Sequence, residues 1–297
     1  MSRQQLLISL PEAAAMVKDG DSVGIGGFVT TNKPMALLRE IMRLRRRDLT
    51  IIAPPSSMEV DMLLGLGLVK KLITPYLGAE AIAPLGPFHS GWAGKKFSIE
   101  ETDLGTLLAG LRAHAMNLPF IPTRGLVGTS FPSLNPTLRY VEDPFGGPPL
   151  VAVPPLEMDV VLLHASQADC YGNVQYLGAT FLDQMMAQAG KKVIVQVEKI
   201  VSSEEIRSHA VNTSLTCEFV DAVVLAPYGA HPMASQNHYR VDAEFLKEYV
   251  RVAKACVKGQ PELFEEFVTK YFDNPVLHND YLTLVGLDRL FSLGEEV

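Results

Sequence analysis

Near-continuous apolar runs recur along this chain and are separated by stretches with helical spacing. The runs are SVGIGGF, LTIIAP, VVLLHA, KVIVQVEKI and DAVVLAPY. Such runs are typical of strands that are buried on both faces of a sheet. The stretch MALLREIMRL instead places Met35, Leu38, Ile41 and Met42 at helical intervals. This alternation predicts an α/β fold with an open, mostly parallel sheet covered by helices.

The two ends of the chain carry helix signals, and residues 121–150 do not. Ser9 and Glu12 form a capping box around Pro11, which predicts a helix that continues through AAAMVK to Asp19–Gly20. Residues 121–150 are rich in proline and glycine, which indicates an extended excursion over the surface. Beyond Val241 the pattern is mostly helical. Because no repeat or linker separates these parts, we expect a single domain over residues 1–297 with a helical C-terminal segment.

Composition narrows the class of protein. The chain has 297 residues, of which 47% are hydrophobic and 20% charged, as in ordinary globular proteins. Its formal net charge of −7 disfavours a nucleic-acid partner, because an acidic surface repels phosphates. Three cysteines without close or metal-binding spacing indicate reduced thiols and no metal site. No signal peptide or run of about 18 apolar residues is present, so we expect a cytoplasmic protein without a membrane partner.

Residues 24–34, GIGGFVTTNKP, join the first predicted strand to a helix, and we call them the glycine loop. Such a turn offers free N–H groups to an anion or a carbonyl group. A dinucleotide-binding fingerprint needs a glycine where Val29 stands, and a P-loop needs a serine or threonine where Pro34 follows Lys33. Both nucleotide-binding interpretations therefore fail. A tight turn with close strand–helix packing remains the alternative to a ligand site.

The glycine loop resembles the alpha-chain signature of family I coenzyme A transferases, and GGF-x-T-x-x-x-P is similar to the glutaconate CoA-transferase branch. Gly24 and Asn32 depart from the signature. Further stretches that resemble this branch in the same order are MNLPFIPTR, YVEDPFGGPPLVAVPPLEMDVVLLHASQADCYGNV, VEKIVSSEEIR, FVDAVVLAPYGAHP and HNDYLTLVGLDRLF. The matching residues of the signature are Asp19, Gly20, Gly26, Gly27, Phe28 and Pro34. The resemblance covers nearly the whole chain and implies the CoA transferase/ribose-5-phosphate isomerase-like fold.

The resemblance also implies that this chain is one of the two kinds of subunit in an enzyme. The nucleophile of the family is a glutamate in a Ser-Glu-Asn-Gly motif, which this sequence lacks. In members with two kinds of chain that glutamate lies on the beta subunit, so this chain is expected to be the alpha subunit of a heteromeric transferase. Transfer would proceed through a glutamyl-CoA intermediate on the partner, with a carboxylic acid, expected to be a dicarboxylic one, as acceptor. The CoA thioester is a substrate, and no tightly bound cofactor or metal is expected.

Several site residues follow from the resemblance. Backbone N–H groups of Gly26, Gly27 and Phe28 would stabilise an oxyanion or shape the wall beside it. Polar residues expected to meet the substrate carboxylate or the pantetheine amides are Thr30, Thr31, Asn32 and Lys33. A clamp for a second carboxylate could come from Arg124, Thr129 and Ser130. The turn residues Asp169, Gly172 and Asn173 would support the site. Otherwise Lys33 and Arg124 are solvated charges, and the turn residues only close their turn.

Other functions stay open at this point. The same scaffold serves ring-opening acyl-CoA hydrolases and decarboxylases, and under the hydrolase alternative Glu101 is the catalytic candidate. Glu101 otherwise suits a helix start as an acidic residue. Glu80 and His89 have no assigned role, His164 is expected to be a hydrogen-bonded histidine, and Cys170 an inert thiol. A small-molecule-sensing module without catalysis is a weaker alternative, since the N-terminus leaves room for only one short helix.

Overall fold

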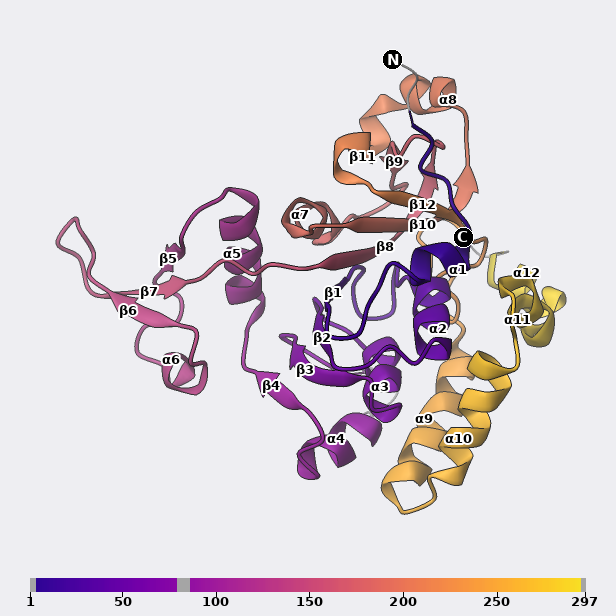
Figure 1. Ribbon diagram of the computed structural model, residues 1–297, viewed down its shortest axis with the longest axis horizontal. Helices are drawn as coiled ribbons and strands as arrows, with labels where there is room; N and C mark the ends of the chain where they lie inside the picture. The colour runs from indigo at the N-terminus through magenta and orange to yellow at the C-terminus, as the bar shows by residue number, and fades with distance from the viewer. Residues whose placement is uncertain (1–3, 79–85, 295–297) are drawn as a thin grey trace.

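The computed structural model describes residues 4–78 and 86–294, and its centre is a nine-stranded sheet (Figure 1). The parallel part has the strand order β12-β10-β8-β1-β2-β3-β4, which confirms the predicted open parallel sheet. Two short antiparallel strands, β9 and β11, extend it beside β8. The strands are β1 Ser22–Ile25, β2 Leu49–Ile52, β3 Val69–Ile73, β4 Ser98–Glu100, β8 Val160–Ala168, β9 Val174–Gln175, β10 Val193–Ile200, β11 Thr213–Leu215 and β12 Ala222–Leu225.

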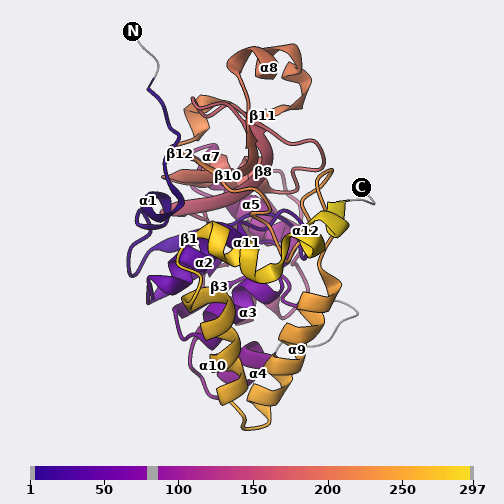
Figure 2. The same cartoon turned by 90° about the vertical axis from the view of Figure 1, so that its right-hand side faces the viewer.

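Helices cover both faces of the sheet and create two cores (Figures 1 and 2). Side chains alternate between the faces along a strand, so Val160 and Leu162 enter one core while Val161 and Leu163 enter the other. Both faces are buried, which explains the continuous apolar runs of the sequence. The helices of this part are α1 Leu10–Ala14, α2 Met35–Arg43, α3 Met58–Gly65, α4 Gly86–Ala93, α5 Leu104–Ala115, α7 Asp183–Ala189 and α8 Ser203–Ser208. Single-turn 3-10 helices occupy Ala210–Asn212 and Cys217–Phe219.

A projecting arm corresponds to the predicted excursion at residues 121–150 and lies to the left in Figure 1. It consists of α6 Phe131–Leu134 and an antiparallel sheet in the order β5-β7-β6, with β5 Ile121–Thr123, β6 Arg139–Val141 and β7 Leu150–Val153. Its small core contains Leu126, Leu138, Val151 and Val153. We call this segment the arm.

The C-terminal segment is helical, as predicted. It comprises α9 Ala243–Val257, α10 Glu262–Val268, a π-helical turn at Thr269–Asp273, α11 His278–Val285 and α12 Leu287–Gly294 (Figure 2). Phe245, Tyr249 and Phe267 are buried in the core that α2 and α3 also share. The Tyr249 hydroxyl donates a hydrogen bond of 2.6 Å to Asp61 on α3. The C-terminal helices therefore pack as part of the layer that covers one face of the sheet.

The first helix differs in length from its prediction. The capping box is confirmed, because the Ser9 and Glu12 side chains each accept a backbone hydrogen bond from the other residue. The helix ends at Ala14, whereas the sequence predicted continuation to Asp19. The reason is local competition, since the Asp21 carboxylate accepts the Lys18 N–H at 2.7 Å and Gly20 turns the chain at a φ of 86°. None of the described helices has the length and apolar character needed to span a membrane.

Candidate active site

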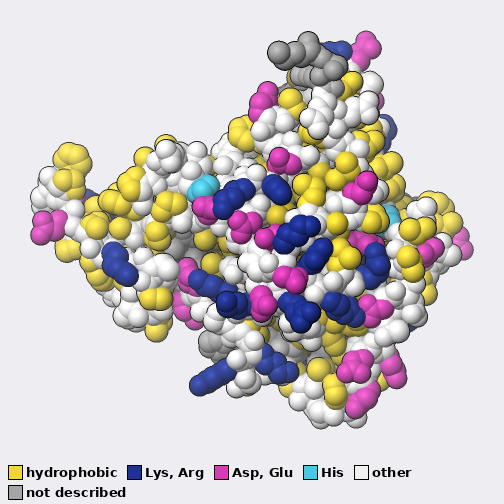
Figure 3. Space-filling model, in the orientation of Figure 1, with side chains coloured by type: hydrophobic (Ala, Val, Ile, Leu, Met, Phe, Trp, Pro, Cys, Tyr) yellow, Lys and Arg dark blue, Asp and Glu magenta, His cyan; other side chains and the backbone are white. Residues whose placement is uncertain are grey.

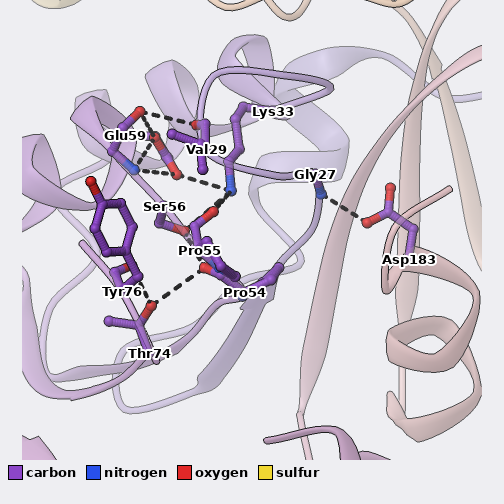
Figure 4. A network of polar contacts seen from close by, with 11 residues as sticks. Gly27, Val29, Lys33, Pro54, Pro55, Ser56, Glu59, Thr74, Tyr76 and Asp183 are labelled. Atoms are coloured by element: carbon purple, nitrogen blue, oxygen red, sulfur yellow. Dashed lines mark hydrogen bonds and ion pairs between the residues drawn. The ribbon is translucent and has the colours of Figure 1, made fainter. Parts of the chain in front are cut away.

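The loops that follow β1, β2 and β3 lie side by side at the carboxyl edge of the sheet. They are the glycine loop, residues 53–57 and residues 74–78. The Val29 N–H donates to the Pro55 carbonyl at 2.6 Å, and the Ser56 N–H donates to the Tyr76 carbonyl at 3.0 Å. The Thr74 hydroxyl donates a hydrogen bond of 3.3 Å to the Pro54 carbonyl (Figure 4). Ligands of open α/β sheets bind at such an edge, so these loops form the candidate site.

The glycine loop is held by its own backbone N–H groups. The Gly26 N–H donates to the Leu162 carbonyl at 2.9 Å, and the Phe28 N–H donates to the Thr31 carbonyl at 2.9 Å. The Gly27 N–H donates to the Asp183 carboxylate at 2.8 Å (Figure 4). All three donors that the sequence suggested for an oxyanion thus have acceptors within this chain. Their geometry favours the wall-forming alternative.

Both central glycines are required by close approach. Gly27 has a φ of 76°, and a Cβ atom there would lie 2.5 Å from the Thr31 carbonyl oxygen and closer still to that of Asn32. A Cβ on Gly26 would lie 2.7 Å from an oxygen of Asp183. Backbone atoms cannot move aside as flexible side chains do, so the loop has this shape only with glycine at position 27.

Asp183 anchors the loop from the opposite side. Its side chain is fully buried at the start of α7, and its second oxygen accepts a hydrogen bond of 3.0 Å from the Tyr176 hydroxyl. Burial raises the pKa of Asp183 to about 6, although the Gly27 and Tyr176 hydrogen bonds and the charge of Lys33 oppose that shift. The sequence did not reveal this residue, because an aspartate at a helix start usually caps its own helix.

Lys33 is buried and ion-paired. Its ammonium group lies 3.1 Å from Glu59, 3.1 Å from the Ser56 hydroxyl and 3.4 Å from the Pro55 carbonyl (Figure 4). The side chains of Lys33 and Glu59 are both 0% exposed, so Lys33 is not the solvated loop lysine of the alternative interpretation. The pair ties the glycine loop to the start of α3. Its role as a ligand-binding residue stays a prediction, and binding would require an exchange with these partners.

The tip of the glycine loop keeps polar groups free. Thr30 and Thr31 are partly exposed, and their hydroxyls make no hydrogen bond to the described residues. Asn32 is buried, and its side-chain oxygen accepts the Gln236 N–H at 3.1 Å. The Phe28 ring stacks on that of Phe181 at 5.2 Å. Thr30 and Thr31 are therefore the predicted residues of this loop that remain available to a substrate.

The predicted carboxylate clamp lies on the arm and not on these loops. Arg124 forms an ion pair of 3.1 Å with Asp143, and its side chain is 69% exposed. Thr129 and Ser130 are exposed in the same segment. In this chain alone, the arm projects away from the sheet (Figure 1), so the structure does not bring the clamp to the glycine loop.

The turn after β8 closes on itself. One oxygen of Asp169 accepts the backbone N–H groups of Tyr171 and Asn173, each at 3.0 Å, and the other accepts the Asn173 amide at 2.8 Å. Burial alone would raise the pKa of Asp169, but hydrogen bonds from Ser203 and Asn173 lower it below its usual value. Gly172 has a φ of 93°, which the turn requires. Such a turn can support the neighbouring loops, and this role stays a prediction.

Glu101 is the residue that the sequence suggested for hydrolysis. Glu101 is exposed before α5, and Asp103 caps that helix by accepting the Thr106 N–H at 2.6 Å. The helix-capping role thus belongs to Asp103. His89 is exposed on α4, and Glu80 lies outside the described residues.

His164 is fully hydrogen-bonded in the middle of β8. Its ring nitrogens lie 2.9 Å from the Ser235 hydroxyl and 2.8 Å from the Gln196 amide, and it forms a 3.1 Å contact with Glu198. Burial alone would raise the pKa of Glu198, but His164 and the Tyr239 hydroxyl lower it. This buried network joins β8 and β10 to the segment that carries Ser235.

Comparisons with known proteins agree on one family. A family model described as Coenzyme A transferase matches residues 7–226. The alpha (A) subunit of the glutaconate CoA-transferase of Acidaminococcus fermentans is 33% identical, over 97% of this chain and 94% of that protein. The crystal structure of glutaconate coenzyme A-transferase from the same organism matches with a TM-score of 0.90 and 32% identity, over 97% of this chain and 95% of that chain.

Relatives with other activities are almost as similar. The cholesterol ring-cleaving hydrolase IpdA subunit of Rhodococcus jostii is 30% identical, over 96% of this chain and 97% of that protein. The crystal structure of the decarboxylase AibA/AibB C56S variant matches with a TM-score of 0.78 and 30% identity, over 90% of this chain and 100% of that chain. Similarity over the whole chain therefore does not by itself separate transfer from hydrolysis or decarboxylation.

Proposed function

Because the chain belongs to the coenzyme A transferase family, we propose that it is the alpha subunit of a heteromeric enzyme that transfers CoA from an acyl-CoA to a carboxylic acid. Its relatives include the corresponding subunits of proteins named glutaconate CoA-transferase and 3-oxoadipate CoA-transferase. The substrate acid is expected to be dicarboxylic, as the sequence suggested. The CoA thioester is a substrate and not a resident cofactor.

One observation carries the proposal of a nucleophile on another chain. At the carboxyl edge of the sheet, the carboxylates of Glu59, Asp183 and Glu198 are buried and occupied by hydrogen bonds or ion pairs. A carboxylate that attacks a thioester must be accessible and unpaired. None of these three carboxylates meets that condition, and the sequence lacks the Ser-Glu-Asn-Gly motif. Glu101 is exposed at the same edge and belongs to the second function considered below.

The proposed reaction proceeds by covalent catalysis on the partner, the beta subunit. Its glutamate attacks the thioester carbonyl carbon and expels the CoA thiolate, which leaves a mixed acyl–glutamyl anhydride. The thiolate then attacks the glutamyl carbonyl and expels the original acid, which leaves a glutamyl-CoA thioester. The incoming acid reverses these steps and departs as the new acyl-CoA. Each tetrahedral intermediate carries an oxyanion, and one well-placed donor stabilises it by roughly 3–4 kcal/mol.

This chain contributes a rigid wall and polar groups to that reaction. The occupied N–H groups of Gly26, Gly27 and Phe28 hold the glycine loop in one shape. We expect the hydroxyls of Thr30 and Thr31 at its tip, which are partly exposed, to donate to a substrate oxygen. Preorganised donors of this kind need no rearrangement during the reaction.

Surface composition supports the presence of a partner chain. The arm exposes large apolar side chains that an isolated protein usually covers. The most exposed of them are Leu134 at 60%, Tyr140 at 54% and Phe145 at 96%. Figure 3 shows apolar side chains gathered on the arm, while Lys, Arg, Asp and Glu are mixed over the centre of the molecule.

A second function, hydrolysis or decarboxylation of an acyl-CoA, is favoured by the similarity to IpdA and to AibA/AibB. Glu101 is the exposed carboxylate available for hydrolysis at this edge of the sheet. A sensing module without catalysis has no specific observation in its favour.

Intact-protein mass spectrometry tests the proposal. The chain and its co-purifying partner are incubated together and separately with an acyl-CoA, and then treated with hydroxylamine. A CoA-sized adduct on the partner alone, lost with hydroxylamine, is the expected result. A partner whose nucleophilic glutamate is changed to glutamine serves as the control and forms no adduct. Turnover without any trapped adduct would contradict transfer and support the second function.

A further inference from the structure

Val29, in the middle of the glycine loop, has a strained backbone. Its φ is 46°, in the left-handed region, which is an outlier for a β-branched residue. Gly27 and Asn32 in the same loop also have positive φ, but glycine and asparagine adopt such angles readily. Strain of this kind persists only where surrounding contacts hold the backbone, and it is concentrated at functional sites. The contacts that hold Val29 therefore bear on the function of the loop.

Two hydrogen bonds to the loop after β2 hold Val29. Its N–H donates to the Pro55 carbonyl at 2.6 Å, and its carbonyl accepts the Ser57 hydroxyl at 3.0 Å. These bonds lie on opposite sides of the Val29 Cα atom, so together they fix both its φ and its ψ. Within the described part of the chain, no backbone N–H donates to the Val29 carbonyl. The Ser57 hydroxyl is therefore the group that holds this side of the strained residue.

Ser57 is itself buried and held in place. Its N–H lies 3.2 Å from each carboxylate oxygen of Glu59. Glu59 also pairs with the Lys33 ammonium at 3.1 Å, and Figure 4 shows it beside Val29. The Ser57 hydroxyl lies 3.2 Å from Glu59 and 3.0 Å from the Val29 carbonyl. Because the Lys33 ammonium and the Ser57 N–H already donate to the carboxylate, the single hydroxyl proton is available to the nearer carbonyl.

The strained residue comes directly before the polar tip of the loop. Thr30 and Thr31 follow it, and both are partly exposed. The Thr30 carbonyl accepts the Ala234 N–H at 2.8 Å, which fixes the next peptide group. A change of the Val29 φ from positive to negative would rotate the backbone that follows it. Thr30 and Thr31 would then lose their present positions.

We propose that Ser57 is a positioning residue for CoA transfer, because its hydroxyl holds Val29 in the left-handed conformation that places the Thr30 and Thr31 hydroxyls for the substrate. The inference rests on the proposed function. Ser57 is 1% exposed and acts through Val29, not on the substrate. A loop that is held in this way offers its donors without rearrangement, whereas a relaxed loop must be reordered in each catalytic cycle.

The test is a double-mutant cycle in the complex of this chain with its partner. Ser57→Ala lets Val29 relax, so kcat/KM for CoA transfer should fall at least about tenfold, chiefly through kcat. In the Val29→Gly background the same change should cost less than about twofold, because glycine adopts a φ of 46° without strain. Ser292→Ala on α12 is the matched control, since its exposed hydroxyl also donates to a backbone carbonyl, and it leaves kcat/KM unchanged.

Two results of the cycle would overturn the proposal. One is an unchanged kcat/KM in Ser57→Ala. The other is an equal loss in both backgrounds, which would mean that Ser57 acts through packing or directly on the substrate. If Ser57→Ala does not fold, Ser57→Cys takes its place in the cycle, because a thiol has nearly the same shape and is a much weaker donor.

A structural measurement separates this proposal from the proposed function. In the crystal structure of the Ser57 variant, the φ of Val29 should be negative. A φ that stays near 46° would refute the positioning role, whatever reaction the complex catalyses. If the wild-type complex transfers no CoA, the proposed function fails, and this comparison still decides whether the Ser57 hydroxyl holds Val29.

Discussion

Substitution of Asp183 by asparagine removes a buried charge and keeps the shape of the side chain. The aspartate accepts hydrogen bonds from the Gly27 N–H at 2.8 Å and the Tyr176 hydroxyl at 3.0 Å, and its side chain is fully buried. The amide oxygen of the variant can accept the Gly27 hydrogen bond. Its amide nitrogen can donate to the Tyr176 oxygen once that hydroxyl rotates. The variant therefore keeps the hydrogen bond to Gly27 and the hydrogen bond to Tyr176 but loses the negative charge.

The magnitude follows from the pKa of the buried carboxyl. Burial raises the pKa of Asp183 from 3.8 to about 6, which corresponds to about 3 kcal/mol. The shift is upward, so the native state binds the proton more tightly than the unfolded state does. The ionised carboxylate costs its full amount above pH 6, and the cost disappears as the pH falls to 3.8. Asp183→Asn should therefore stabilise the chain by about 3 kcal/mol at about pH 8 and by almost nothing at about pH 4.

Urea denaturation of both proteins at pH 8 and pH 4 measures this difference. Asp159→Asn is a control of opposite sign, because hydrogen bonds from the Ser22 N–H and hydroxyl lower the pKa of Asp159 to about 2. That variant should destabilise the chain at pH 8, and its effect should shrink only as the pH falls below 3.8. Destabilisation by Asp183→Asn at pH 8, or a difference that does not change with pH, would refute the reasoning.

Three other changes test the site. Gly27→Leu puts a leucine where the backbone φ is 76° and pushes its Cβ against two carbonyl oxygens. It should abolish transfer and lower the free energy of unfolding by roughly 3 kcal/mol, while the far-UV circular dichroism spectrum is retained. Full activity would contradict the role of the loop. Lys33→Met leaves Glu59 buried without its ion-pair partner, so it should lower the free energy of unfolding, measured with urea, by about 3–5 kcal/mol. Adding Glu59→Met should recover much of that loss. A loss below about 1 kcal/mol would argue against the ion pair. Glu101→Gln should keep most of the rate of CoA transfer in the complex. A fall of about 100-fold or more in the rate of acyl-CoA hydrolysis would instead support the hydrolase alternative.

Patterns within one segment made much of the fold predictable. The continuous apolar runs identified β1, β2, β8, β10 and β12, because both faces of these strands are buried. The capping box located the start of α1, since Ser9 and Glu12 are only three residues apart. The length of α1 was wrong, because Asp21 competes for the backbone beyond Ala14. The short strands of the arm carried too few residues to show a period.

The candidate site was predictable in place but not in detail. Glycines at the end of the first strand marked the glycine loop, because few other sequences allow a backbone to turn so closely. That Lys33 is buried and ion-paired could not be read from the sequence, since Glu59 lies 26 residues further along and belongs to another helix.

By itself the sequence determined the α/β class, the helical C-terminal segment, the glycine loop and the missing Ser-Glu-Asn-Gly nucleophile. These properties depend on residue types and on spacings of a few positions, so they can be read from the sequence alone. Only the tertiary structure decided which N–H groups are occupied and which carboxylates are buried. Gly27 and Asp183 are 156 residues apart, yet their hydrogen bond shapes the loop. Such contacts join segments that are distant in the sequence. They form because the carboxyl ends of the parallel strands, with the loops that follow them, meet at one edge of the sheet.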